Sequence, residues 1–144
     1  MTARLSTADL LGGWRLVSWE VESEGAVRRP FGDHPTGLLC YTFDGWMSAC
    51  IASAERPALS AGSPRQSSAE EQAAAFTTYF TYAGRYDVVG EDVVHHVEVA
   101  LNPAMVGTDQ VRRVALDGDT LMLSAGEPVS DGAVRSHRLT WQRP

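Results

Sequence analysis

Residues 84 to 124 read "GRYDVVGEDVVHHVEVALNPAMVGTDQVRRVALDGDTLMLS", and this stretch decides the fold class. It consists of short segments rich in valine and leucine, separated by the connections "GED", "NPAMVGT" and "DGD". Short β-branched segments bounded by Gly, Asn, Asp and Pro are typical of antiparallel strands joined by tight turns. The stretch therefore predicts a run of neighbouring antiparallel strands.

Segments of the same kind lie on both sides of this run. They are "GWRLVSWEVES" (13–23), "TGLLCYTF" (36–43) and "WMSACIA" (46–52) before it, and "AVRSHRLTWQR" (133–143) after it. Many short strands joined by turns favour an antiparallel barrel, because closure removes the exposed sheet edges. A barrel of about eight strands also leaves an interior for one small ligand. We therefore predict an all-β fold in which residues 1–144 form a single domain, an eight-stranded antiparallel up-and-down barrel.

One segment departs from the strand pattern and lies between the third and fourth predicted strands. Ser68 followed by Glu71 fits a capping box, which commonly starts a helix. Apolar residues then recur at helical spacing until a glycine ends the pattern: Ala69, Ala73, Phe76 and Phe80. The pattern predicts a helix over 69–83. The preceding loop, 52–67, is rich in Pro, Ser and Ala, and we expect the loop and the helix to cap or flank an opening to the barrel interior.

Composition and charge exclude several classes of function. The chain has 144 residues and a formal net charge of −6, with its arginines scattered along the sequence. Binding to a phosphate backbone needs a concentrated basic surface, so we expect no nucleic-acid partner. No apolar run approaches the ~20 residues that span a bilayer, and the N-terminus lacks the apolar core of a secretory signal. We expect a soluble, cytoplasmic protein with no membrane partner, and the sequence leaves a homodimer open.

Two cysteines flank the turn "FDGW" (43–46). With a two-residue loop at Asp44-Gly45, Cys40 and Cys50 lie on opposite faces of the hairpin. With a three-residue loop they share a face but are only diagonal neighbours, which is poor geometry for a disulfide. Either loop predicts two free thiols.

The segment "VVHHVEVAL" (93–101) carries two histidines and a glutamate within four positions. Alternation gives the lumen the more apolar face, which consists of Val93, His95, Val97, Val99 and Leu101. His96 and Glu98 then point outward. A metal site needs three or four converging ligands, and the other histidines lie in a loop and in the last strand, so we predict no metal site. For His95 two interpretations stay open, a core histidine satisfied by a neighbour or a residue that contacts or reacts with a ligand.

The next predicted strand, "TDQVRRVAL" (108–116), places two polar residues on the same face as Val114. A register centred on "NPAMVG" sets Val97 opposite Arg112 and His95 opposite Val114, which brings Gln110, Arg112 and His95 onto one wall. A lumenal arginine beside an amide and an imidazole is suited to anchor a carboxylate, enolate or carbonyl oxygen. The alternative, that Arg112 points to solvent, stays open.

The segment "LLGGWRLVSWE" (10–20) contains a Gly-x-Trp pattern, Gly12 and Trp14, that resembles the first strand of the calycin proteins. With "HHVE", "VGTDQVRR" and the closing "HRLTWQR", nearly the whole chain resembles the small bacterial lipocalin-like domains. The resemblance implies that Trp14 closes one end of the barrel and that an arginine of the last strand lies across it. Arg143 is the better match, because it shares a face with Leu139 and Trp141. The predicted helix departs from standard lipocalins, which carry theirs after the barrel.

Aromatic residues complete the predicted site. Those expected to contact a ligand are Trp19, Tyr41, Tyr79 and Tyr86, since an aromatic cavity with a few polar groups is the general form of a small-molecule site. No phosphate-binding loop and no nucleophile elbow occurs, so we expect no cofactor.

Two classes of function stay open. The preferred hypothesis is a protein that binds a small hydrophobic, oxygen-bearing metabolite in the lumen and cyclises or isomerises it without a cofactor. In that hypothesis His95 transfers a proton and Arg112 holds an oxyanion. The resemblance permits it, because lipocalin-like and related barrels include cyclases that act on polyketide-type substrates. The alternative is a non-catalytic carrier or sensor of a hydrophobic small molecule.

Overall fold

The computed structural model describes residues 4–128, 132 and 134–144. The strands in this part of the chain are β1 (Gly12–Ser23), β2 (Ala26–Arg28), β3 (Thr36–Tyr41), β4 (Trp46–Ala52), β5 (Tyr79–Val89), β6 (Asp92–Ala100), β7 (Asp109–Asp117), β8 (Thr120–Pro128) and β9 (Val134–Gln142). The helices are α1 (Thr7–Leu10) and α2 (Ala69–Thr77), with 3-10 turns η1 (Pro64–Gln66) and η2 (Pro103–Met105). None of these described helices is long and apolar enough to cross a membrane.

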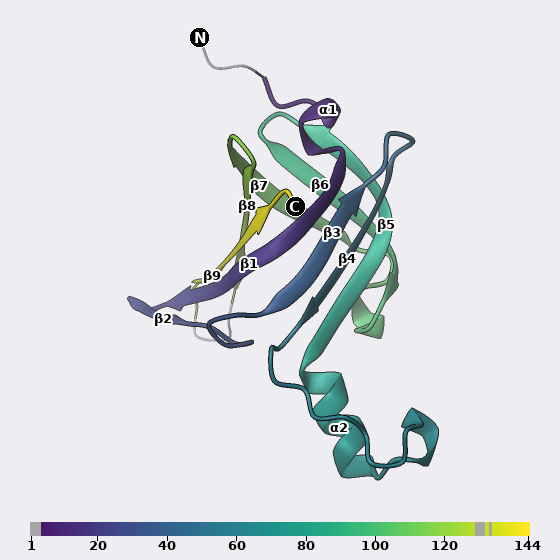
Figure 1. Ribbon diagram of the computed structural model, residues 1–144. Helices are drawn as coiled ribbons and strands as arrows, with labels where there is room; N and C mark the ends of the chain where they lie inside the picture. The colour runs from purple at the N-terminus through teal and green to yellow at the C-terminus, as the bar shows by residue number, and fades with distance from the viewer. Residues whose placement is uncertain (1–3, 129–131, 133) are drawn as a thin grey trace.

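The strands form one antiparallel sheet that closes on itself. Each strand from β3 to β8 pairs with the next along the chain, β1 pairs with β3, and the ring closes where β1 also pairs with β9 (Figure 1). This confirms the predicted eight-stranded barrel, with α2 inserted between β4 and β5. The short strand β2 was not predicted; it pairs only with the end of β1 and extends that strand as a hairpin outside the ring.

One end of the barrel is sealed by Trp14, as the Gly-x-Trp pattern predicted. Trp14 is 1% exposed, and the Arg143 guanidinium lies 4.0 Å from the centre of its indole ring. The indole Nε1 donates to the carbonyl of Leu10, and Arg143 donates to the carbonyls of Asp9 and Leu11. The arginine therefore binds the end of α1 across the base of the barrel, and the cation–π contact helps to hold it there.

The helix α2 is shorter than the sequence pattern predicted. It ends at Thr77, and β5 begins at Tyr79, so residues 79–83 are strand rather than helix. Pairing of Phe80 with Ile51 continues the sheet, and the lumen gains the side chains of Phe80 and Tyr82. Burial of these aromatic rings outweighs the weak helical preference of a segment that contains Thr77, Thr78 and Thr81.

The loop and helix between β4 and β5 do not cap the cavity. Figure 1 shows α2 extending beyond one end of the barrel, at the end opposite α1. Of the described residues between 53 and 78, none lines the barrel cavity, although Ile51 and Phe80 on either side do. The segment therefore does not cap the cavity, and it flanks the end of the barrel where these two lining residues lie.

The β3–β4 hairpin has the longer of the two predicted loops. Thr42 N–H donates to the carbonyl of Trp46, and Gly45 has a φ of 95°, a conformation that favours glycine. Cys40 pairs with Ser48, and Cys50 pairs with Leu38, so the cysteines share the outer face as diagonal neighbours. Both are free thiols, as predicted.

The connection between β6 and β7 differs from the predicted register. Val93 pairs with Arg112 and His95 with Gln110, a shift of four residues from the expected pairs, so the same side chains still face inward. The shift arises because the last pair before the turn is Val97 of β6 with Thr108, whereas the predicted register set Val97 opposite Arg112. A bulge at Glu98 then turns Val99 outward, where it is 68% exposed instead of lumenal.

Candidate ligand-binding site

The barrel encloses a cavity of about 460 Å³, within the range of about 300–1,000 Å³ that is usual for small-molecule sites. Most of its lining is apolar, and a few polar side chains converge on it. The lining residues are Trp19, Leu39, Ala49, Ile51, Phe80, Tyr82, His95, Met105, Gln110, Arg112, Leu123, Ala125, Gly126, Glu127, His137, Leu139 and Trp141.

His95 lies at the wall of this cavity between two tyrosines. It is 1% exposed; the Tyr41 hydroxyl of β3 lies 2.7 Å from Nε2, and the Tyr82 hydroxyl of β5 lies 2.6 Å from Nδ1. Burial lowers the pKa of His95 to about 3, and the nearby positive charge of Arg112 adds to the effect. The imidazole is therefore neutral near pH 7, and both of its nitrogens are already hydrogen-bonded.

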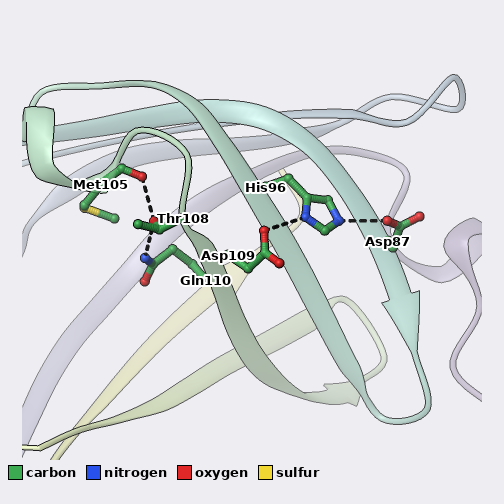
Figure 2. Close-up of polar contacts among 6 residues, drawn as sticks. All are labelled: Asp87, His96, Met105, Thr108, Asp109 and Gln110. Atoms are coloured by element: carbon green, nitrogen blue, oxygen red, sulfur yellow. Dashed lines mark hydrogen bonds and ion pairs between the residues drawn. The ribbon is translucent and has the colours of Figure 1, made fainter.

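Arg112 supplies the positive charge of the cavity. Its Nη2 donates to Gln110 Oε1 at 3.2 Å, and its Nη1 donates to the carbonyl of Val111. Gln110 is oriented in turn, because its Nε2 donates to Thr108 Oγ1, which donates to the carbonyl of Met105 (Figure 2). No carboxylate of the described residues forms an ion pair with Arg112. The guanidinium thus lines a mostly apolar cavity and has no counter-ion within the part of the chain that the structure describes.

A second polar group lies where β1, β8 and β9 meet. Trp19 Nε1 donates to His137 Nδ1 at 3.2 Å, and His137 Nε2 lies 2.7 Å from a carboxylate oxygen of Glu127. The hydrogen bond from His137 lowers the pKa of Glu127. Because Nδ1 accepts from the indole, the Nε2 proton is directed to Glu127, so these side chains satisfy one another.

A model of the lipocalin-like domain family matches residues 11–144. The chain belongs to the lipocalin-like domain family. Over 83 residues it is 36% identical to a 4′-hydroxy-3′-methoxypropiophenone carrier protein, ppsC, of Aspergillus oryzae. That alignment covers 51% of this chain and 75% of the fungal protein.

In this lipocalin-like barrel, the structure gathers four of the residues proposed from the sequence. His95, Gln110, Arg112 and Trp19 all line the cavity. The face assigned to His95 and Arg112 is therefore correct, although the register used to join them was wrong.

Three predicted tyrosines do not line the cavity of the lipocalin-like barrel. Tyr41 is buried behind His95, and Tyr86 packs edge-on against Tyr41 while donating to the carbonyl of Thr42. Tyr79 pairs with Ala52 on the outer face, beneath the guanidinium of Arg56.

Four polar lining residues were not proposed from the sequence. Tyr82 was assigned to the helix, and the alternation of Phe80, Tyr82 and Tyr86 is the signal that could have placed it on a strand. Trp141 was assigned to an apolar face without a role in binding. Glu127 and His137 meet only through the pairing of β8 with β9 and gave no local signal.

The outer face of the lipocalin-like barrel carries a separate histidine contact. His96 points away from the lumen and lies between Asp109, at 2.7 Å from Nδ1, and Asp87, at 2.8 Å from Nε2 (Figure 2). These carboxylates raise the pKa of His96, Asp109 more than Asp87. Within the described residues, no group of three or more His, Cys, Asp or Glu side chains is arranged to hold a metal ion.

Proposed function

We propose that this protein is a non-catalytic carrier of a small aromatic ketone, which it binds inside the barrel. The observation that carries the proposal is the cavity of about 460 Å³, mostly apolar and aromatic, with Tyr82, Trp141 and Arg112 on its wall. Apolar walls with a few fixed polar groups suit a flat hydrophobic ring that bears oxygen. The relation to a carrier of 4′-hydroxy-3′-methoxypropiophenone, an aryl ketone with a phenol group, supports the same ligand class.

The pKa and the hydrogen bonds of His95 favour the carrier function over the cyclase or isomerase hypothesis. A general base works best with a pKa near the operating pH, whereas the pKa of His95 is lowered to about 3. Tyr41 is hydrogen-bonded to Nε2 and Tyr82 to Nδ1, so neither ring nitrogen is free to take a proton from a ligand. His95 is better suited to hold the two tyrosine hydroxyls in fixed positions than to transfer protons.

The proposal is tested by titrating the protein with 4′-hydroxy-3′-methoxypropiophenone and following the fluorescence of Trp19 and Trp141, which line the cavity. We expect saturable binding at one site per chain, and the ketone is expected to be recovered chemically unchanged after prolonged incubation.

A matched pair of variants shows whether the lumen is the binding site. Ala125→Trp places an indole in the cavity and is expected to abolish binding, whereas Ala115→Trp, on the exposed outer face of β7, should leave it intact. Absence of saturable binding, equal binding by both variants, or conversion of the ketone to a product would each contradict the proposal.

A further inference from the structure

The hydrogen bonds around His95 leave one tyrosine proton free to meet a ligand. A neutral imidazole has one N–H and one acceptor nitrogen, so one tyrosine donates to the ring and the other accepts from it. Within the described part of the chain, the Tyr41 hydroxyl contacts only His95 Nε2. A buried hydroxyl proton without an acceptor is costly, so Tyr41 donates to Nε2 and the Nδ1–H of His95 donates to Tyr82. The Tyr82 hydroxyl therefore keeps its own proton for the cavity that it lines.

Trp141 provides a second unused donor. It is 2% exposed and lines the cavity, and its buried Nε1 has no hydrogen-bond partner among the described residues. An indole N–H can only donate, and native proteins seldom leave such a group unpaired. The side chain that carries this unpaired donor forms part of the cavity wall, where a ligand can supply the missing acceptor.

Arg112 adds a positive charge to these neutral donors. It approaches the His95 cluster closely enough to lower the pKa of His95 and to oppose the burial-driven rise in the pKa of Tyr41 and Tyr82. The other titratable groups that line the cavity are Glu127 and His137, which are bound to each other. The carboxylate of the site is thus already engaged, and the inner wall offers donors and a cation to a ligand.

We propose that the lumen binds its ketone as an oxyanion, the deprotonated form of an acidic hydroxyaryl ketone, with Arg112 as counter-ion and Tyr82 and Trp141 donating to the ligand oxygens. In such an anion the phenolate charge is shared with the ketone oxygen, so both oxygens accept strongly. The phenol proton is released to solvent on binding. This inference rests on the proposed function and deepens it by specifying the charge of the ligand.

The test compares 4′-hydroxy-3′-methoxypropiophenone with its 3′,4′-dimethoxy analogue, which cannot ionise. Absorption spectra recorded across a pH titration report the phenolate of the bound ligand directly. We expect the pKa of the bound phenol to fall by about one unit or more, which corresponds to about tenfold tighter binding of the anion. The pH dependence of binding of the dimethoxy analogue serves as the control for the protein's own titratable groups.

Variants assign the effect to Arg112. Arg112→Gln should remove the preference for the anion while still binding the dimethoxy analogue, and Arg112→Lys should restore part of the preference. Arg113→Gln is the matched control, because Arg113 pairs with Glu91 and Asp92 on the outer face, and it should bind as the wild type does. Tyr82→Phe should weaken binding of both ketones, since both offer a carbonyl acceptor.

The outcomes separate this inference from the proposed function. If both ketones bind but the pKa of the bound phenol is unchanged or raised, the oxyanion proposal is wrong and the carrier proposal stands. Retention of the anion preference in Arg112→Gln would also overturn the oxyanion proposal. If neither ketone binds the wild type, both proposals fail.

Discussion

At the scale of single residues, the most informative contrast is between the neighbours His95 and His96. His95 faces the lumen and is held by two tyrosines, whereas His96 faces outward between two aspartates. The two faces of one strand therefore shift the pKa of a histidine in opposite directions. Burial lowers the pKa of His95 to about 3, and carboxylates raise the pKa of His96.

This contrast predicts opposite effects of pH on stability. The unfolded chain binds a proton at His95 more readily than the folded chain does. The contribution of His95 to the free energy of unfolding is therefore fully present above the unfolded pKa of about 6.5, and it is lost as the pH drops toward 3. The loss can reach about 1.4 kcal/mol per pH unit. Urea unfolding of His95→Gln between pH 4 and pH 8 should show a shallower acid slope than the wild type.

His96→Gln is the comparison for this measurement. The contribution of His96 is present below about pH 6.5 and is lost as the pH rises through its raised folded pKa. Its replacement should therefore lower stability at acid pH and leave the alkaline end unaffected. Because His96 and its carboxylates are exposed, salt should reduce the effect. Identical acid slopes in wild type and His95→Gln would contradict the account of His95.

Residue-scale prediction from the sequence succeeded where alternation alone was sufficient. Alternation placed His95 and Arg112 in the lumen and His96 outside it. It could not find the contact of His95 with Tyr41, which lies 54 positions away along the chain, or the partners of His137. Contacts of this kind depend on how β3, β8 and β9 are placed around the ring, and no local pattern encodes that placement.

At the scale of elements, the β5–β6 pair illustrates how backbone geometry supports the site. Gly84 lies opposite the bulge at Glu98, so close that an added Cβ would come within 1.8 Å of the carbonyl oxygen of His96. The bulge is also the point where β6 changes the face it shows to the lumen. The glycine at position 84 therefore permits the close approach of β5 to the bulge of β6. The two halves of β6 on either side of this bulge present opposite alternation to the lumen.

We predict that Gly84→Ala lowers the free energy of unfolding by about 2–4 kcal/mol, because main chain must move to admit the methyl group. Gly13→Ala is the matched control in another strand: its Cβ would meet no atom within 4 Å, and its cost should stay below about 1 kcal/mol. Denaturant unfolding of the two variants measures the difference. Equal stabilities would show that β5 and β6 are not packed as described.

Element-scale prediction failed at the ends of segments rather than at their centres. The helix was extended through Phe80 and Tyr82 because aromatic residues fit both a helical stripe and a strand in this segment. Only the pairing with β4 distinguishes the two. Likewise, the β6–β7 register depends on where the pairing closes, at Val97 with Thr108, and on the η2 turn, which a count of residues from the middle of the loop cannot include.

At the scale of the whole molecule, closure gives the two ends of the barrel different roles. One end is sealed by Trp14, Arg143 and the end of α1, whereas Trp19, Phe80 and Glu127 line the cavity toward the other end. In the proposed carrier, a ligand that enters from this end passes apolar walls before it reaches Tyr82, Arg112 and His95. The repeated strands and turns predicted the closed barrel, and the Gly-x-Trp resemblance predicted its sealed base.

The function proposed for this barrel is the binding of a small aromatic ketone in the lumen. A crystal structure of the protein with 4′-hydroxy-3′-methoxypropiophenone bound tests it most directly. We expect the ring inside the barrel, with a ligand oxygen about 2.7–3.2 Å from a donor of Tyr82, Trp141 or Arg112. A ligand bound only on the outer surface, with the lumen empty of it, would contradict the account.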